Sequence, residues 1–156
     1  MRNITGDIIS SDKWNHPASI IFSGSSGTGK TSLALKLIEN QHFSERIENV
    51  FYFGPNGNMA KELDWHNILE DVSVTYTEGV PSERFFASIP PKTLVVVDDQ
   101  YEESINAYQI AKAFKVDRRH SNFSIILITQ SFFERGKYAK VIRNNCEVFA
   151  LFRNYG

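Results

Sequence analysis

The chain has 156 residues, which suits one domain, 1–156, large enough to bury a hydrophobic core. Its formal net charge of -1 at pH 7 excludes the overall basic field that would by itself indicate nucleic-acid binding. The single cysteine, Cys146, excludes an intrachain disulfide and a cysteine-based zinc site, and we expect it to be buried. No apolar run is long enough to cross a membrane and no signal-peptide pattern opens the chain, so we expect no membrane insertion and an intracellular location.

Residues 1–17 are polar and mixed, and they predict an N-terminal extension before the first strand. Trp14 lies near the end of this extension.

The apolar run at residues 20–22 predicts a buried strand, and a glycine-rich segment follows it. Residues 24–31 read GSSGTGKT and match the P-loop spacing G-x-x-x-x-G-K-[ST]. Its glycines allow positive φ angles, so that backbone N–H groups can turn inward around a phosphate. Apolar residues then recur at helical spacing over 33–38, which predicts a helix with its positive end at the same anion.

The P-loop chemistry assigns a role to each side chain that follows the glycines. Lys30 is predicted to bring its charge to the β- and γ-phosphates, and Thr31 to ligate Mg²⁺. The predicted nucleotide-binding residues are Gly24, Ser25, Ser26, Gly27, Thr28, Gly29, Lys30, Thr31 and Ser32.

Trp14 precedes the first predicted strand, at a place from which P-loop proteins often reach the nucleotide base. Two interpretations are open: Trp14 stacks on adenine, or it buries its ring in a hydrophobic contact, as most lone tryptophans do.

The next part of the chain predicts two strands and a helix. Residues 50–53 (VFYF) favour a strand that ends at the turn 54–57, and residues 72–76 favour another. The secondary structure of residues 58–69 is ambiguous, and one interpretation is a short helix. Residues 81–88 predict a helix with Ser82 in its N-cap region.

Residues 93–100 (TLVVVDDQ) predict a strand buried on both faces, as found at the centre of a parallel sheet. Its two acids come at the carboxyl end, where ligands bind in open α/β sheets. Asp98 has the position of a Walker B aspartate that holds Mg²⁺. Asp99 stands where many ATPases with a P-loop and a Walker B strand have the acid that orients or deprotonates the attacking water.

The C-terminal part predicts alternating helices and strands. Residues 102–116 indicate a covering helix that ends in the polar segment 117–122, and residues 123–129 (FSIILIT) indicate a second fully buried strand. Residues 132–145 predict a loop and a short helix, and residues 148–152 a last strand. Gln130 follows the buried strand, where it can hydrogen-bond both the attacking water and the γ-phosphate.

Taken together, these elements predict an α/β P-loop NTPase of the RecA-like ASCE type, with a mostly parallel sheet and an extra strand between the Walker A and Walker B strands. Over residues 20–152 the chain resembles the genome-packaging ATPases of poxvirus-type and other large DNA viruses and related mobile elements, in the FtsK/HerA-like superfamily. The matching features beyond the P-loop are Asp98, Asp99, Arg119, His120, residues 124–133 (SIILITQSFF), residues 136–138 (GKY), Ile142 and Asn145.

The resemblance implies an ATP-hydrolysing subunit that translocates double-stranded DNA. It implies ATP and Mg²⁺ as ligands, with Asp98 on the metal, Asp99 as the catalytic carboxylate and Gln130 as the sensor. Asp99 is one methylene shorter than the glutamate that related pumps often have. Arg119 is the first candidate for a finger that completes the site of the next subunit in a homo-oligomeric ring, before Arg118, Arg143 and Arg153. A cation at a helix end that faces solvent is an equal interpretation of Arg119.

The resemblance also implies partners and a location. The implied partner is a capsid or portal-type viral protein. The implied location is the host cytoplasm or nucleus, together with the virion. Lys137, Lys140 and Arg143 are candidates for contacts with DNA phosphates, although a solvated basic face is an equal interpretation.

Three rival functions share the P-loop. A GTPase requires an [NT]-K-x-D segment, and residues 114–117 (FKVD) lack its first polar residue and lie within a predicted helix. A nucleoside or small-molecule kinase requires an arginine-rich lid, for which Arg118 and Arg119 form the nearest cluster. A nucleotide-dependent assembly module would bind ATP with negligible turnover.

Overall fold

The structure is a computed structural model. It describes residues 2–5, 12–55, 65–99, 107–131 and 135–153, with the side chains of 2–5 and 116–119 outside the description. The predicted turn 54–57, the ambiguous segment 58–69 and the helix 102–116 therefore lie partly outside the described residues.

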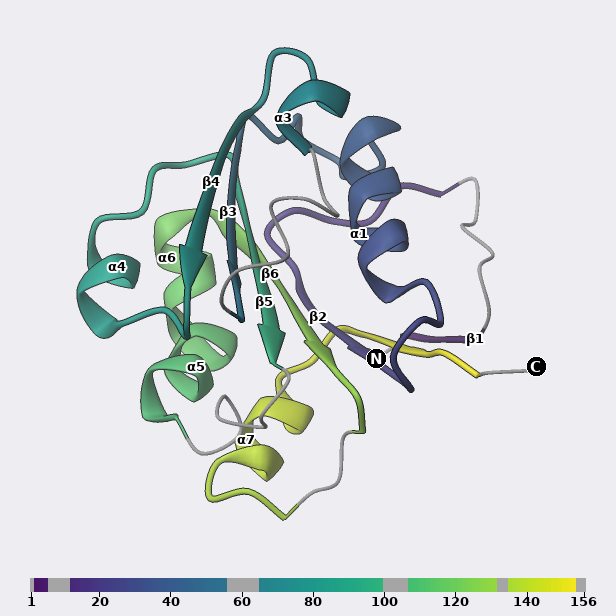
Figure 1. The fold of residues 1–156 in the computed structure, drawn as a ribbon. Coiled ribbons are helices and arrows are strands. Elements are labelled where there is room, and N and C mark those ends of the chain that lie inside the picture. The colour runs from purple at the N-terminus through teal and green to yellow at the C-terminus, as the bar shows by residue number, and fades with distance from the viewer. Residues whose placement is uncertain (1, 6–11, 56–64, 100–106, 132–134, 154–156) are drawn as a thin grey trace.

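The described strands form one seven-stranded sheet in which every pair of neighbours is parallel (Figure 1). Their order across the sheet is β1-β7-β2-β6-β5-β3-β4. The strands are β1 (Arg2–Thr5), β2 (Ser19–Ser23), β3 (Asn49–Gly54), β4 (Ser73–Glu78), β5 (Thr93–Asp99), β6 (Phe123–Thr129) and β7 (Val148–Leu151).

The P-loop strand and the acidic strand are separated by one other strand. β6 pairs with β2 through Ile21 and Leu127, and with β5 through Val97 and the same Leu127. The sequence predicted this extra strand between Walker A and Walker B strands, and the prediction is confirmed. The chain therefore has the α/β P-loop NTPase fold of the ASCE, RecA-like type.

Helices cover both faces of the sheet (Figure 1). One apolar cluster includes α1 and Trp65 of α3 with one face of the strands, and a second includes residues of α4, α5 and α7 with the other face. Because β2 and β6 are buried along their whole length, both faces of the sheet centre are covered. The helices are α1 (Lys30–Glu39), α3 (Trp65–Ile68), α4 (Glu83–Ala87), α5 (Tyr108–Lys112), a π-helix (Ala113–Asp117), α6 (Arg118–Ser121) and α7 (Ala139–Asn144).

Several local predictions are confirmed. The Ser82 hydroxyl accepts a hydrogen bond from the Phe85 backbone N–H at 3.2 Å and so caps α4. Cys146 is buried, and burial raises the pKa of its thiol to about 12. Trp14 is 3% exposed and packs edge-on against Phe22 and Phe43, so the hydrophobic interpretation holds and its ring is not open to a nucleotide base.

One prediction about element boundaries was wrong. Within the predicted extension 1–17, Arg2–Thr5 is a strand paired with β7, because the open edge of β7 offers backbone partners that no local pattern reveals. The predicted end of the covering helix in the polar segment 117–122 is confirmed, since α6 ends at Ser121. The π-helix before α6 keeps Ala113 and Phe114 fully buried.

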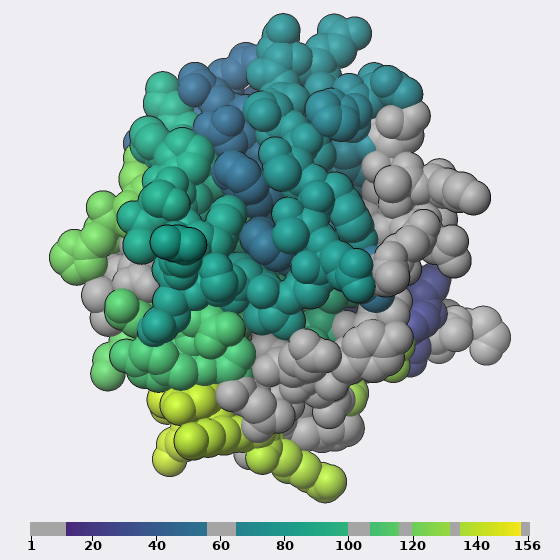
Figure 2. Space-filling view, turned by 60° about the vertical axis from the view of Figure 1, so that its left-hand side comes forward, coloured from purple at the N-terminus to yellow at the C-terminus, as the bar shows by residue number. Residues whose placement is uncertain are grey.

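β4 forms one edge of the sheet, and its side chains are mostly exposed. Figure 2 turns the left-hand side of Figure 1 toward the viewer, and the teal residues of this part of the chain occupy much of that face. In the described part of the chain, no helix has the length and apolar character needed to cross a membrane.

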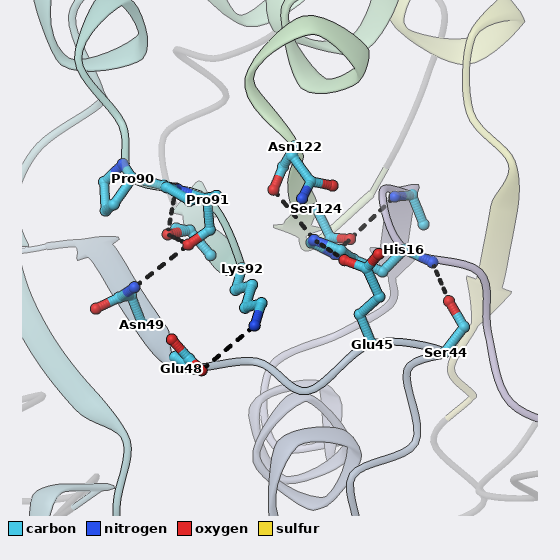
Figure 3. A network of polar contacts seen from close by, with 12 residues as sticks. His16, Ser44, Glu45, Glu48, Asn49, Pro90, Pro91, Lys92, Asn122 and Ser124 are labelled. Atoms are coloured by element: carbon cyan, nitrogen blue, oxygen red, sulfur yellow. Dashed lines mark hydrogen bonds and ion pairs between the residues drawn. The ribbon is translucent and has the colours of Figure 1, made fainter.

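Polar contacts tie together the amino ends of the central strands, opposite the P-loop (Figure 3). The buried His16 imidazole lies 2.6 Å from the Ser124 hydroxyl through Nδ1 and 3.1 Å from the Asn122 carbonyl oxygen through Nε2. The Ser124 oxygen also accepts the Ala18 N–H at 2.9 Å. These bonds join the segment before β2 to the start of β6 and fix the two strands next to each other.

Candidate nucleotide-binding site

The P-loop leaves the carboxyl end of β2 and is fixed there by backbone contacts. The Gly24 N–H donates to the Thr129 carbonyl at 3.1 Å, and the Phe152 N–H donates to the Ser23 carbonyl at 2.7 Å. A Cβ on Gly24 would lie 2.4 Å from the Phe152 oxygen, so only glycine fits between the strands. The loop therefore begins where β2, β6 and β7 end side by side.

The second half of the loop takes conformations that favour glycine. Gly27 and Gly29 have φ angles of 77° and 96°, and a Cβ on either would meet no atom within 4 Å. The Thr28 hydroxyl donates to the Ser25 carbonyl at 2.7 Å, which closes the turn. Gly29 is the N-cap of α1, whose first N–H groups have no intrahelical acceptor and point toward the loop.

Lys30 lies inside the loop that it belongs to. It is 7% exposed, and its ammonium donates to the carbonyl oxygens of Gly24 at 2.5 Å and Ser25 at 2.7 Å. Burial lowers the pKa of Lys30, and the negative charge of Asp98 opposes that shift. The positive charge is thus placed at the centre of the loop, near enough to Asp98 for the two charges to interact.

Asp98 is brought to the P-loop side of the sheet, and a tyrosine connects it to Thr31. The Tyr52 hydroxyl donates to the Asp98 Oδ2 at 3.1 Å, and the Thr31 side chain lies near enough to interact with the same hydroxyl. Burial raises the pKa of the Asp98 carboxyl, against the lowering effects of the Tyr52 hydrogen bond and the Lys30 charge. Burial and Asp98 together raise the pKa of Tyr52, so its hydroxyl remains a donor.

Asp99 does not share this arrangement. It is 4% exposed, and it follows Asp98 directly in β5, where successive side chains point to opposite faces of the sheet. Asp98 continues the face of Val96, in the cluster that includes α1, whereas Asp99 continues the face of Val97, in the other cluster. The role predicted for Asp99 stays a prediction.

Gln130 reaches the P-loop from the end of β6. Its Nε2 donates to the Ser26 hydroxyl at 2.9 Å, and both side chains are exposed. The predicted sensor thus touches the tip of the P-loop.

The structure describes the side chains of two of the four candidate arginine fingers. Arg119 and Arg118 belong to α6, and their side chains lie outside the described residues. The Arg143 guanidinium lies 4.3 Å from the centroid of the Phe149 ring, and Arg153 is exposed at the end of the described chain. The assignment of Arg119 stays a prediction.

The predicted magnesium ligands fit the preferences of that ion. Thr31 and Asp98 supply a hydroxyl and a carboxylate oxygen, and Mg²⁺ in phosphate sites commonly takes one or two such groups with phosphates and waters. Among the described residues there is no group of three or more His, Cys, Asp or Glu side chains that would hold a different metal.

Two features of the site were not predicted from the sequence: Tyr52, and the hydrogen bond that the Ser26 hydroxyl accepts from Gln130. Tyr52 lies in the run VFYF, where it is the one hydroxyl among apolar side chains, and that was the available signal. Its contact with Asp98 depends on the pairing of β3 with β5, which no local pattern predicts.

No protein-family model and no curated protein matched the chain. Solved structures did match, among them the assembled ATPase EscN from the type III secretion system of enteropathogenic E. coli, with 14% sequence identity and a TM-score of 0.46. The similarity covers 87% of this chain and 43% of EscN, so this chain spans less than half the length of that protein.

Proposed function

We propose that this chain binds and hydrolyses ATP as the motor subunit of a DNA-packaging or DNA-translocating assembly of a virus or related mobile element. One arrangement supports the proposal most strongly. Lys30 and Asp98 lie near enough for their charges to interact, while Gln130, at the end of the intervening strand, contacts the loop. This combination serves phosphate binding and phosphate sensing in one site.

Each residue has a task that follows from its chemistry. The P-loop N–H groups and Lys30 bind the phosphates, and Lys30 stabilises the charge that develops on the γ-phosphoryl group. Thr31 and Asp98 would hold Mg²⁺, which when bound neutralises phosphate charge. Asp99 is proposed to orient or deprotonate the attacking water, and Gln130 to hydrogen-bond that water and the γ-phosphate.

The assembly is proposed to be a homo-oligomeric ring in which Arg119 completes the site of the neighbouring subunit. An arginine finger contributes about 10³- to 10⁵-fold to kcat, so an isolated subunit should hydrolyse ATP slowly. The proposed partners are double-stranded DNA and a capsid or portal-type protein, inside the host cell and in the virion.

DNA would be held through its phosphates by basic side chains on and before α7. Lys137 lies over the Tyr138 ring at 5.4 Å from its centroid, and Lys140 is exposed. With Arg143 they would contact the backbone without reading sequence, so binding should weaken as salt concentration rises.

The test is ATP hydrolysis measured against protein concentration, with and without double-stranded DNA, for the parent, Asp99→Asn and Arg119→Ala. The proposal expects turnover per subunit to rise with concentration and with DNA, and to be lost in both variants. In a mixture of the two variants, partial recovery is expected, because each would supply the group that the other lacks.

Other outcomes would favour the rival functions. Turnover independent of concentration and DNA but stimulated by an added nucleoside would favour a kinase. Tight ATP binding with negligible turnover, even in an oligomer, would favour a nucleotide-dependent assembly module. Either result would overturn the motor proposal.

A further inference from the structure

The Tyr52 hydroxyl lies between the two side chains predicted to bind magnesium. It donates to the Asp98 Oδ2 at 3.1 Å, and the Thr31 side chain lies near enough to interact with it. Thr31 lies in the first turn of α1 and Asp98 is the last residue but one of β5, so these side chains come from elements far apart in the sequence. One phenolic oxygen therefore lies next to both.

The Tyr52 ring has little freedom to move. It is 2% exposed and packs edge-on against Trp65, with ring centroids 5.1 Å apart, and it stacks on Tyr76 at 5.6 Å with an interplanar angle of 14°. Contacts on two sides hold the ring, so its hydroxyl is presented at one place. A group held this way can define the position of its hydrogen-bond partners.

Strand register explains why a tyrosine is needed here. Tyr52 pairs with Val96, two residues before Asp98, so both side chains lie on the same face of the sheet. The carboxylate is about 6.6 Å further along the strand direction, at about 3.3 Å per residue, which is close to the length of a phenol side chain. A phenylalanine would fill the same volume and leave Thr31 and Asp98 without their shared partner.

We infer that Tyr52 is a positioning residue that sets the spacing of the Thr31 and Asp98 oxygens for magnesium. The inference rests on the proposed function, because it assumes that these oxygens bind the metal of an ATP complex. Mg²⁺ requires near-ideal octahedral geometry, so a small displacement of either ligand costs affinity. Partners that orient metal ligands typically contribute about 10- to 100-fold to metal affinity.

The test compares Tyr52→Phe with Tyr76→Phe in the full chain. Tyr76 is the stacked neighbour, and its hydroxyl donates to the Pro55 carbonyl at 3.0 Å instead of to the metal ligands. The dissociation constant of a fluorescent ATP analogue is measured in excess Mg²⁺ and in EDTA. The ratio of the two constants gives the coupling between metal and nucleotide without any measurement of turnover.

We expect Tyr52→Phe to reduce this coupling ratio by about 10-fold or more while the constant in EDTA stays within about 2-fold of the parent. Tyr76→Phe should leave both constants unchanged. The thermal unfolding midpoint, read by circular dichroism, verifies that both variants fold.

Three results would overturn the inference, and they differ in what else they affect. An unchanged ratio in Tyr52→Phe refutes the positioning role and leaves the proposed function standing. If Tyr52→Phe loses nucleotide affinity equally in EDTA and in Mg²⁺, the hydroxyl has a structural role and does not position the metal ligands. Absence of metal-dependent nucleotide binding in the parent overturns the proposed function as well.

Discussion

Gln130 donates a hydrogen bond from its Nε2 to the hydroxyl of Ser26, over 2.9 Å, and so joins the end of β6 to the tip of the P-loop. β6 is buried along its whole length and lies between the P-loop strand and the acidic strand. A change in what the loop binds can therefore be transmitted to a strand at the centre of the sheet. This relationship leads to the first of four predictions.

Gln130→Ala should lower kcat for ATP hydrolysis by about 10²-fold while ATP affinity changes little, because a polar group that contacts the reacting atoms acts mainly in the transition state. Ser26→Ala removes the partner seen here and keeps the glutamine. It should reduce kcat much less. Steady-state kinetics on both variants provide the measurement, and equal kcat losses would contradict a sensor role for Gln130.

Lys30→Ala should abolish detectable ATP hydrolysis and weaken nucleotide binding, because it removes the charge that the loop holds at its centre. A loss in kcat of about 10²- to 10³-fold is expected. Lys36→Ala is the matched control, since Lys36 is exposed on the same helix. If the Lys30 variant kept parental turnover, the P-loop would not be the catalytic site.

Gly24→Ala should destabilise the fold more than Gly27→Ala. At Gly24 the new Cβ would lie 2.4 Å from the Phe152 backbone oxygen, and overpacking of this kind costs about 1–3 kcal/mol. At Gly27 the Cβ meets open space, and the left-handed conformation alone costs about 1–2 kcal/mol. Urea unfolding of both variants gives the two free energies, and the reverse order would contradict the packing argument.

His16 should make stability depend on pH. Burial is the largest effect and lowers its pKa below 6.5, although the Glu45 charge and the hydrogen bond to Asn122 act in the opposite direction. The unfolded chain therefore binds a proton before the folded chain does, and the free energy of unfolding falls as pH drops below about 6.5. The loss is complete once the pH lies below the lowered pKa of the folded state.

His16→Gln should flatten this dependence, measured as the free energy of unfolding in urea at several pH values between 5 and 8. Each unit by which the pKa is lowered corresponds to about 1.4 kcal/mol of lost stability at low pH. His66→Gln is the control, because His66 is exposed on α3 and should leave the slope as it is. If His16→Gln kept the parental slope of unfolding free energy against pH, other groups would be the cause of the pH dependence.

Much of this protein follows from local sequence patterns. The spacing of Gly24, Gly29 and Lys30 predicted the phosphate loop, since positive φ angles and a following helix depend on residues next to one another. The apolar runs at 93–97 and 123–129 predicted strands buried on both faces. The Ser82 cap was predictable for the same reason, because donor and acceptor lie three residues apart.

What depended on distant contacts needed the tertiary structure. Arg2–Thr5 becomes a strand through the open edge of β7, and the fit of Gly24 against Phe152 joins residues far apart in the chain. Tyr52 reaches Asp98 only because β3 pairs with β5 in a register that places both side chains on one face. Periodicity in the sequence determines which face of the sheet a residue can occupy. Which residue of another strand it contacts on that face depends on how the strands assemble.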